Sequence, residues 1–182
     1  MPGALPDGEP VPVAGTLPGS ALGGLGERPF GFYVHVPFCA TRCGYCDFNT
    51  YTAAELGAGP AAVSPGNYAD LATAEIRFAR RRLGNADVPV STVFFGGGTP
   101  TLLPPSALGA VVRAIDAEFG LAPGAEVTTE ANPESVDEAS LSELRAQGLT
   151  RVSFGMQSAV PPVLAVLDRA PGRPGSSTSA WT

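Results

Sequence analysis

Short apolar runs alternate with longer amphipathic stretches through the middle of the chain. Runs rich in β-branched and aromatic residues predict four strands, at residues 31–36, 91–97, 126–132 and 151–158. Apolar residues at three- and four-residue spacing predict helices at residues 67–83, 105–119, 138–147 and 161–169. The pattern therefore predicts four β/α units in which each strand is followed by a helix.

The expected helix at residues 105–119 shows this periodicity most clearly. One face of it carries the apolar residues Leu108, Val111, Val112, Ile115 and Phe119. Gly148 stands where the following helix is expected to end, because glycine readily adopts the left-handed conformation that terminates helices.

Alternating strands and helices predict an α/β fold, with a parallel sheet and right-handed crossovers. Four units make only half of an eight-unit barrel, so we expect a partial, TIM-like barrel that is truncated after about four β/α units. The last strand would then have an unpaired edge, which needs further chain or a partner to cover it.

The two ends of the chain lack this periodicity. Residues 1–28 are dominated by glycine, proline and alanine, and we expect a disordered N-terminal arm there. The folded core is expected to span residues 29–169. In residues 170–182 the chain turns to glycine, proline, serine and threonine where such a sheet should supply another strand. We interpret this irregular tail as aberrant, from a fragment or from a reading frame that departs from its ancestor near residue 170.

Composition and charge narrow the classes of function that are expected and disfavour nucleic-acid binding. The 182 residues are 44% apolar, which is enough for one domain with a core. The net charge of −6 disfavours nucleic acid as a partner, because sequence-independent binding needs clustered cations. The arginine run at residues 80–82 falls late in an expected helix, where cations complement the helix dipole.

The sequence also lacks the patterns of membrane insertion and export. No window reaches eighteen uninterrupted apolar residues, so no transmembrane segment is expected. The N-terminus has neither the basic nor the apolar region of a signal peptide. We therefore expect a cytoplasmic location, where clustered thiols indicate metal or redox chemistry rather than disulfides.

All three cysteines, Cys39, Cys43 and Cys46, follow the first expected strand with C-x3-C-x2-C spacing. This spacing lets one turning loop direct three sulfurs toward one point, which suits a [4Fe-4S] cluster held by three thiolates. The fourth iron would then be open to a small chelating molecule, like the open coordination position of a catalytic metal site.

A structural zinc ion is the main alternative on spacing alone, because His35 would complete a Cys3His ligand set. Alternation along the strand should direct His35 away from the cysteines, which favours the cluster. Three unrelated buried thiols are disfavoured, because the rest of the chain has no cysteine.

Polar or glycine features recur at the other strand ends, where parallel α/β folds bind ligands. The second strand runs into GGGTP at residues 96–100, whose glycines let the backbone approach a ligand, although a tight turn explains them equally well. The third ends in Glu130, which can accept hydrogen bonds from a ribose diol or an amine, or favour a helix N-terminus. The fourth ends at Gln157, which suits ligand binding or a turn.

Together these features resemble the radical S-adenosylmethionine (SAM) superfamily, whose cysteine motif follows the first strand of a partial (β/α)6 barrel. The resemblance extends from about Phe30 to Arg169. More narrowly, the chain is similar to the oxygen-independent coproporphyrinogen III oxidase family, in the stretches YVHVPFCATRCGYCDF, FFGGGTPTLL, TTEANPES and RVSFGMQS with VLDR.

Two branches of that family differ in function. The coproporphyrinogen dehydrogenases of porphyrin biosynthesis carry a further cysteine two positions after the third, where this chain has Phe48. The chain thus resembles the heme chaperone (HemW) branch, which implies binding and delivering heme rather than decarboxylating a porphyrinogen. The dehydrogenase, a zinc-stabilised binding module and an inactive fragment remain as alternatives.

The resemblance also implies a role for individual residues. The three cysteines would ligate the cluster, and its open iron would chelate the amino and carboxylate groups of SAM. The SAM contacts would be Tyr33, Tyr45, Gly97, Gly98, Thr99, Glu130, Gln157 and Arg169. The ordinary alternatives are packing for the two tyrosines and a surface helix-end cation for the arginine, and no catalytic residue is assigned.

Partners follow from the same resemblance. They are heme as cargo, a heme-accepting protein and an electron donor, with a homodimer as a further expectation. In the family, an electron entering the cluster cleaves SAM to methionine and a 5'-deoxyadenosyl radical, whereas heme transfer is the role of the chaperone branch. Later barrel strands and a C-terminal domain of the family are missing from the sequence. We therefore expect this chain to retain the cluster loop but to be impaired in stable SAM binding and heme transfer.

Overall fold

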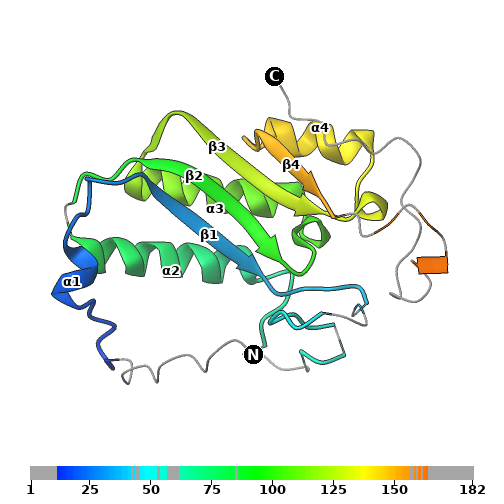
Figure 1. The fold of residues 1–182 in the computed structure, drawn as a ribbon, viewed down its shortest axis with the longest axis horizontal. Helices are drawn as coiled ribbons and strands as arrows, with labels where there is room; N and C mark the ends of the chain where they lie inside the picture. The colour runs from blue at the N-terminus through cyan, green and yellow to red at the C-terminus, as the bar shows by residue number, and fades with distance from the viewer. Residues whose placement is uncertain are drawn as a thin grey trace.

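A computed structural model describes residues 12–41, 43, 46–52, 54–56, 62–84, 86–155, 158, 160 and 162–163. The described strands form one parallel sheet in the order β1-β2-β3-β4, so each strand lies beside its predecessor in the chain (Figure 1). They are β1 (Phe30–Val36), β2 (Val90–Gly97), β3 (Leu121–Ala131) and β4 (Arg151–Phe154). This confirms the expected α/β fold with a parallel sheet.

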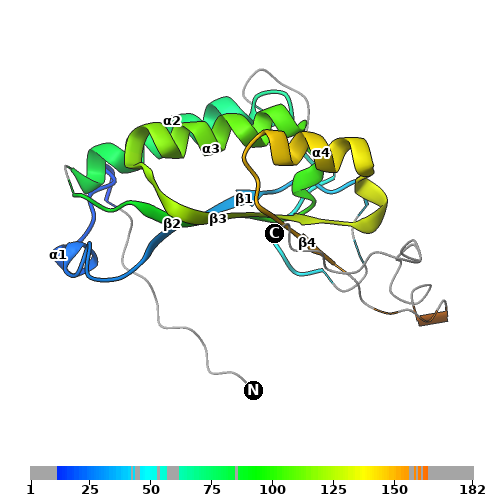
Figure 2. The ribbon, with the colours of Figure 1, turned by 90° about the horizontal axis from the view of Figure 1, so that it is seen from above.

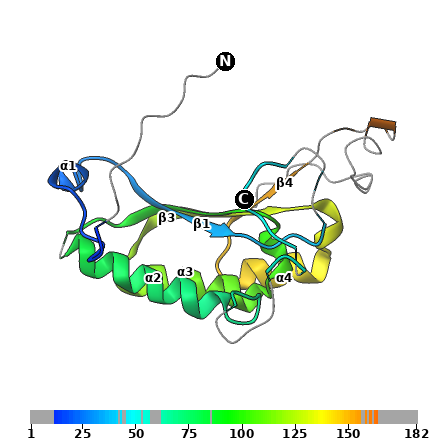
Figure 3. The same ribbon diagram turned by 90° about the horizontal axis from the view of Figure 1, so that it is seen from below.

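The helices between the strands cover one face of this sheet, as Figures 2 and 3 show from two sides. They are α2 (Tyr68–Leu83), α3 (Pro105–Phe119) and α4 (Glu138–Ala146), preceded by a short α1 (Gly19–Leu22). Two 3-10 turns, η1 (Pro100–Leu102) and η2 (Pro133–Ser135), follow β2 and β3. No helix in the described part of the chain is long and apolar enough to cross a membrane.

The core lies between the sheet and this helical layer. The apolar face predicted for α3 is buried throughout, from Leu108 to Phe119. Strand alternation sends Val34 and Val36 of β1 into the same core, while Tyr33 and His35 occupy the opposite, uncovered face. The helices therefore fix the sheet from one side and leave polar side chains accessible on the other.

Most element boundaries match the sequence predictions within a residue or two. β3 begins at Leu121 rather than at residue 126, and β4 ends at Phe154 rather than at residue 158. Gly148 has a φ of 96° directly after α4, as expected for a residue that ends a helix. The last predicted helix, at residues 161–169, lies mostly outside the described residues, as does the tail at residues 170–182.

The N-terminal arm touches the fold before β1 begins. Residues 1–11 lie outside the described residues, but residues 12–28 include α1, and Leu25 packs against the core. The arm and tail boundaries at residues 28 and 169 stay predictions, and the contact of Leu25 shows that at least part of the arm is attached to the core.

Candidate functional site

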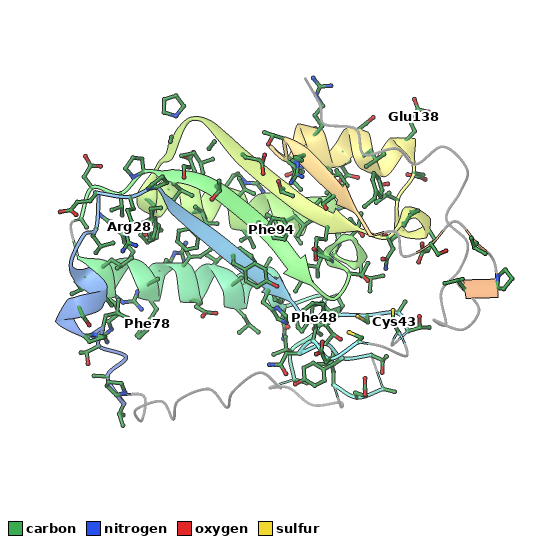
Figure 4. The ribbon with its side chains drawn as sticks, viewed as in Figure 1. Arg28, Cys43, Phe48, Phe78, Phe94 and Glu138 are labelled. Carbon is green, nitrogen blue, oxygen red and sulfur yellow. The ribbon has the colours of Figure 1, made fainter. Side chains whose placement is uncertain are left out.

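A cavity of about 750 Å³ opens beyond the carboxyl ends of the four strands. We call it the strand-end cavity. Figure 4 shows Cys43 and Phe48 beyond the ends of β1 and β2. The predicted site residues that line it are Cys39, Cys43, Cys46, Gly97, Gly98, Thr99 and Glu130. The structure thus brings the cysteine motif, the glycine run and the acid of the third strand to one place.

The cysteines lie on a loop, residues 37–51, that leaves β1 and returns to it. The backbone N–H of Tyr51 donates to the Pro37 carbonyl at 2.7 Å, and that of Cys39 donates to the Tyr51 carbonyl at 3.0 Å. These bonds form a parallel bridge between Phe38 and Tyr51 just beyond the strand. The two ends of this cysteine loop are therefore fixed to each other, and the thiols between them stay at the cavity.

The glycine run after β2 packs directly against the start of the cysteine loop. Gly98 N–H donates to the Val36 carbonyl at 2.8 Å, and Thr99 N–H donates to the Phe38 carbonyl at 2.7 Å. A Cβ atom at Gly98 would collide with the Phe38 carbonyl and lie 3.0 Å from the Cys39 sulfur. A side chain is therefore excluded at Gly98, which gives the GGGTP run a specific structural reason beyond a tight turn.

His35 connects β1 to the far side of the cysteine loop. Its Nε2 lies 2.8 Å from the carbonyl oxygen of Asn49, which can only accept, so Nε2 carries the hydrogen. In the neutral ring Nδ1 then accepts from the hydroxyl of Tyr33, at 3.1 Å. Burial raises the pKa of Tyr68 to about 12, so its hydroxyl stays protonated and donates to the His35 carbonyl at 2.6 Å.

This geometry argues against the zinc alternative. Both ring nitrogens of His35 already have partners, so neither points at the thiols as a free ligand. Within the described residues, no three His, Cys, Asp or Glu side chains gather closely enough to hold a single metal ion. A [4Fe-4S] cluster has no such requirement, because each thiolate binds a different iron.

The three cysteines are free and half-buried, and their chemistry fits a cluster. Burial is the main cause that raises the pKa of the Cys39 thiol, and the nearby Cys46 and Cys43 raise it further. Hydrogen bonds from Thr50 and Thr99 act in the opposite direction. Deprotonated, three thiolates in one cavity would need a cationic partner, and soft sulfur ligands suit both zinc and iron–sulfur clusters, so the geometry of His35 decides between them.

Polar side chains cross-link the ends of β2 and β3 beside the thiols. The carboxylate of Glu130 accepts from Gly97 N–H at 3.3 Å. The amide of Asn132 donates to the Thr99 hydroxyl at 3.1 Å, and the hydroxyls of Thr101 and Ser135 lie 2.6 Å apart. The two strand ends are therefore held in register, with a carboxylate facing the cavity.

The remaining predicted SAM contacts are placed differently or are not described. Tyr33 is 61% exposed on the open face of β1, where its ring stacks on Phe94 with centroids 6.1 Å apart. It lines a smaller cavity of about 380 Å³ beside α2 rather than the strand-end cavity. Its contact with SAM stays a prediction. Tyr45, Gln157 and Arg169 lie outside the described residues.

Comparisons with known proteins agree with this geometry. The model of the Radical SAM superfamily matches residues 33–175. The heme chaperone HemW of Mycobacterium tuberculosis (strain ATCC 25618 / H37Rv) is 50% identical over 93% of this chain and 41% of its own length. The mitochondrial radical S-adenosyl methionine domain-containing protein 1 of Mus musculus is 39% identical over 75% of this chain and 29% of its own length.

A solved structure shows the same fold. It is the coproporphyrinogen III oxidase HemN from Escherichia coli, described as a radical SAM enzyme, with a TM-score of 0.69 and 28% identity. The match covers 83% of this chain and 33% of that one, so the chain spans well under half of these relatives. Because the family model covers most of the sequence, from the middle of β1 through the cysteine loop and the other three strands, the chain belongs to the radical SAM superfamily.

Proposed function

We propose that this chain binds a [4Fe-4S] cluster through Cys39, Cys43 and Cys46 and presents its open iron to SAM. The observation that carries the proposal is the meeting of these thiols with Gly98 and Glu130 at one cavity beyond the strand ends. When bound, the cluster supplies the electron for reductive chemistry on SAM.

The chain's own residues would bind and orient SAM beside the cluster. Glycine at positions 97 and 98 leaves room for a ligand to approach the backbone, and the Glu130 carboxylate can accept hydrogen bonds from an amine or a ribose diol. Thr99, Tyr33, Tyr45, Gln157 and Arg169 belong to the same proposal as further contacts.

We further propose that the chain acts as a heme chaperone of the HemW type, with heme and a heme-accepting protein as partners. Relatives that carry this name reach 50% identity. Phe48 supports this branch over the dehydrogenase, because it lines the cavity where a further cysteine is expected in the enzyme, and it is 68% exposed. We also propose that the chain receives electrons from a donor, forms a homodimer and is located in the cytoplasm.

Cluster binding is tested by anaerobic reconstitution with iron and sulfide, followed by the visible spectrum and metal analysis. We expect the wild type to gain broad visible absorption from thiolate-ligated iron, and Cys43→Ala to lose it. His35→Ala should still bind the cluster, since the imidazole holds the loop and not the metal. A colourless protein with one zinc ion that His35→Ala abolishes would contradict the proposal.

Glu130→Gln tests the SAM contact. Loss of a charge-assisted hydrogen bond costs about 1.5–3 kcal/mol, so we expect SAM to bind the cluster-loaded variant at least about tenfold more weakly in equilibrium dialysis. Glu126→Gln is the matched control, because Glu126 lies on the same strand but pairs with Arg151 at 3.6 Å. An equal affinity in the wild type and both variants would remove Glu130 from the SAM site.

Heme binding is tested by titrating this chain and the full-length M. tuberculosis relative with heme. Apolar ligands bury most of their surface in apolar pockets. Among the described residues at the strand-end cavity, the large exposed apolar side chains are Phe48 and Leu102, which offer little apolar surface to a heme. We therefore expect this chain to bind heme at least about tenfold more weakly than the relative, a difference of about 1.4 kcal/mol. Equal affinities would refute this expectation.

A further inference from the structure

Thr50 is a buried polar residue inside the cysteine loop. Its side chain is 1% exposed, although the loop lies at the surface and its neighbour Tyr51 is 40% exposed. A buried hydroxyl needs a hydrogen-bond partner, because leaving it unpaired costs about 1–3 kcal/mol. The polar groups that lie within reach of the Thr50 hydroxyl are therefore its expected hydrogen-bond partners.

One partner of Thr50 is the Cys46 thiol. The Thr50 Oγ1 lies 3.7 Å from the Cys46 sulfur, within range for a hydrogen bond to sulfur. Once Cys46 is a thiolate it can only accept, so the Thr50 hydroxyl must be the donor.

We propose that Thr50 is a positioning residue that raises the reduction potential of the cluster by donating a hydrogen bond to its Cys46 thiolate. The inference rests on the proposed cluster site. Hydrogen bonds to the ligating sulfurs help to set cluster potentials, and second-shell donors tune metal ligands generally. Reduction adds negative charge to the cluster, so a donor to sulfur stabilises the reduced state more than the oxidised state.

The test compares three variants by spectroelectrochemical titration of the reconstituted chain without SAM. Thr50→Val keeps the shape and removes the hydroxyl, and we expect its potential to become more negative by up to a tenfold change in the reduction equilibrium, which is about 59 mV for one electron. Thr50→Ser keeps the hydroxyl and should retain the wild-type potential.

Thr52→Val is the matched control. Thr52 lies two residues further along, and its hydroxyl donates to the Glu55 carboxylate at 2.9 Å rather than to a thiol. This variant loses a threonine hydroxyl from the same region and should leave the potential unchanged. A shift equal to that of Thr50→Val would overturn the inference, because the effect would then not depend on contact with the sulfurs.

The remaining outcomes separate this inference from the proposed function. A fully loaded Thr50→Val protein with the wild-type potential would overturn the role of Thr50 and leave the cluster site intact. If Thr50→Val loses the cluster, Thr50→Ala repeats the test. If Thr50→Val and Thr50→Ala both lose the cluster while Thr50→Ser retains it, the result supports a role for the Thr50 hydroxyl at the cluster. If all three variants lose the cluster, that role is overturned. A wild type that takes up no cluster would overturn both proposals.

Discussion

Main-chain hydrogen bonds that continue the sheet beyond β1 and β2 hold the cysteine loop in place. Thr99 N–H reaches the Phe38 carbonyl on one side, and Tyr51 N–H reaches the Pro37 carbonyl on the other. The segment at residues 37–39 therefore has a backbone partner on each side, although it lies outside any strand. A loop anchored in this way can carry three thiols without depending on their side chains for its own shape.

Several features of the strand-end cavity follow from this anchoring. Gly98 has to be glycine because the anchored Phe38 carbonyl occupies the space that a side chain would need. His35 extends the anchoring to Asn49 on the returning half of the loop. Thr50, next in the chain after Asn49, then turns inward toward Cys46. A cofactor that binds such a preorganised site loses less affinity to ordering the chain.

The sequence predicted the parts of this arrangement that depend on periodicity and spacing. Strand and helix positions follow from local apolar patterns, and parallel strand ends must meet at one edge, so the gathering of Cys39, Gly98 and Glu130 was predictable. The early start of β3 was not, because LAPGA lacks a strand pattern and contains proline and glycine.

The surroundings of the thiols could not be found in this way. The contacts of Thr50 depend on where the returning half of the loop packs, which is set by tertiary contacts rather than by any local pattern. Asn132 had a weak local indication, since N-P-E-S matches a capping box with Ser135, but its bond to Thr99 joins residues from two different strand ends. Tyr33, expected among the SAM contacts, lines a neighbouring cavity, and its contact with SAM stays a prediction.

We propose that three anchored thiolates hold a cluster with one iron left open for SAM. Mössbauer spectroscopy of the chain reconstituted with 57Fe tests it most directly, because this method distinguishes iron sites by their ligands. We expect saturating SAM to change the spectrum of one iron in four and to leave the three thiolate-bound irons unchanged. Four irons that respond alike, or a spectrum that saturating SAM does not alter, would contradict this arrangement.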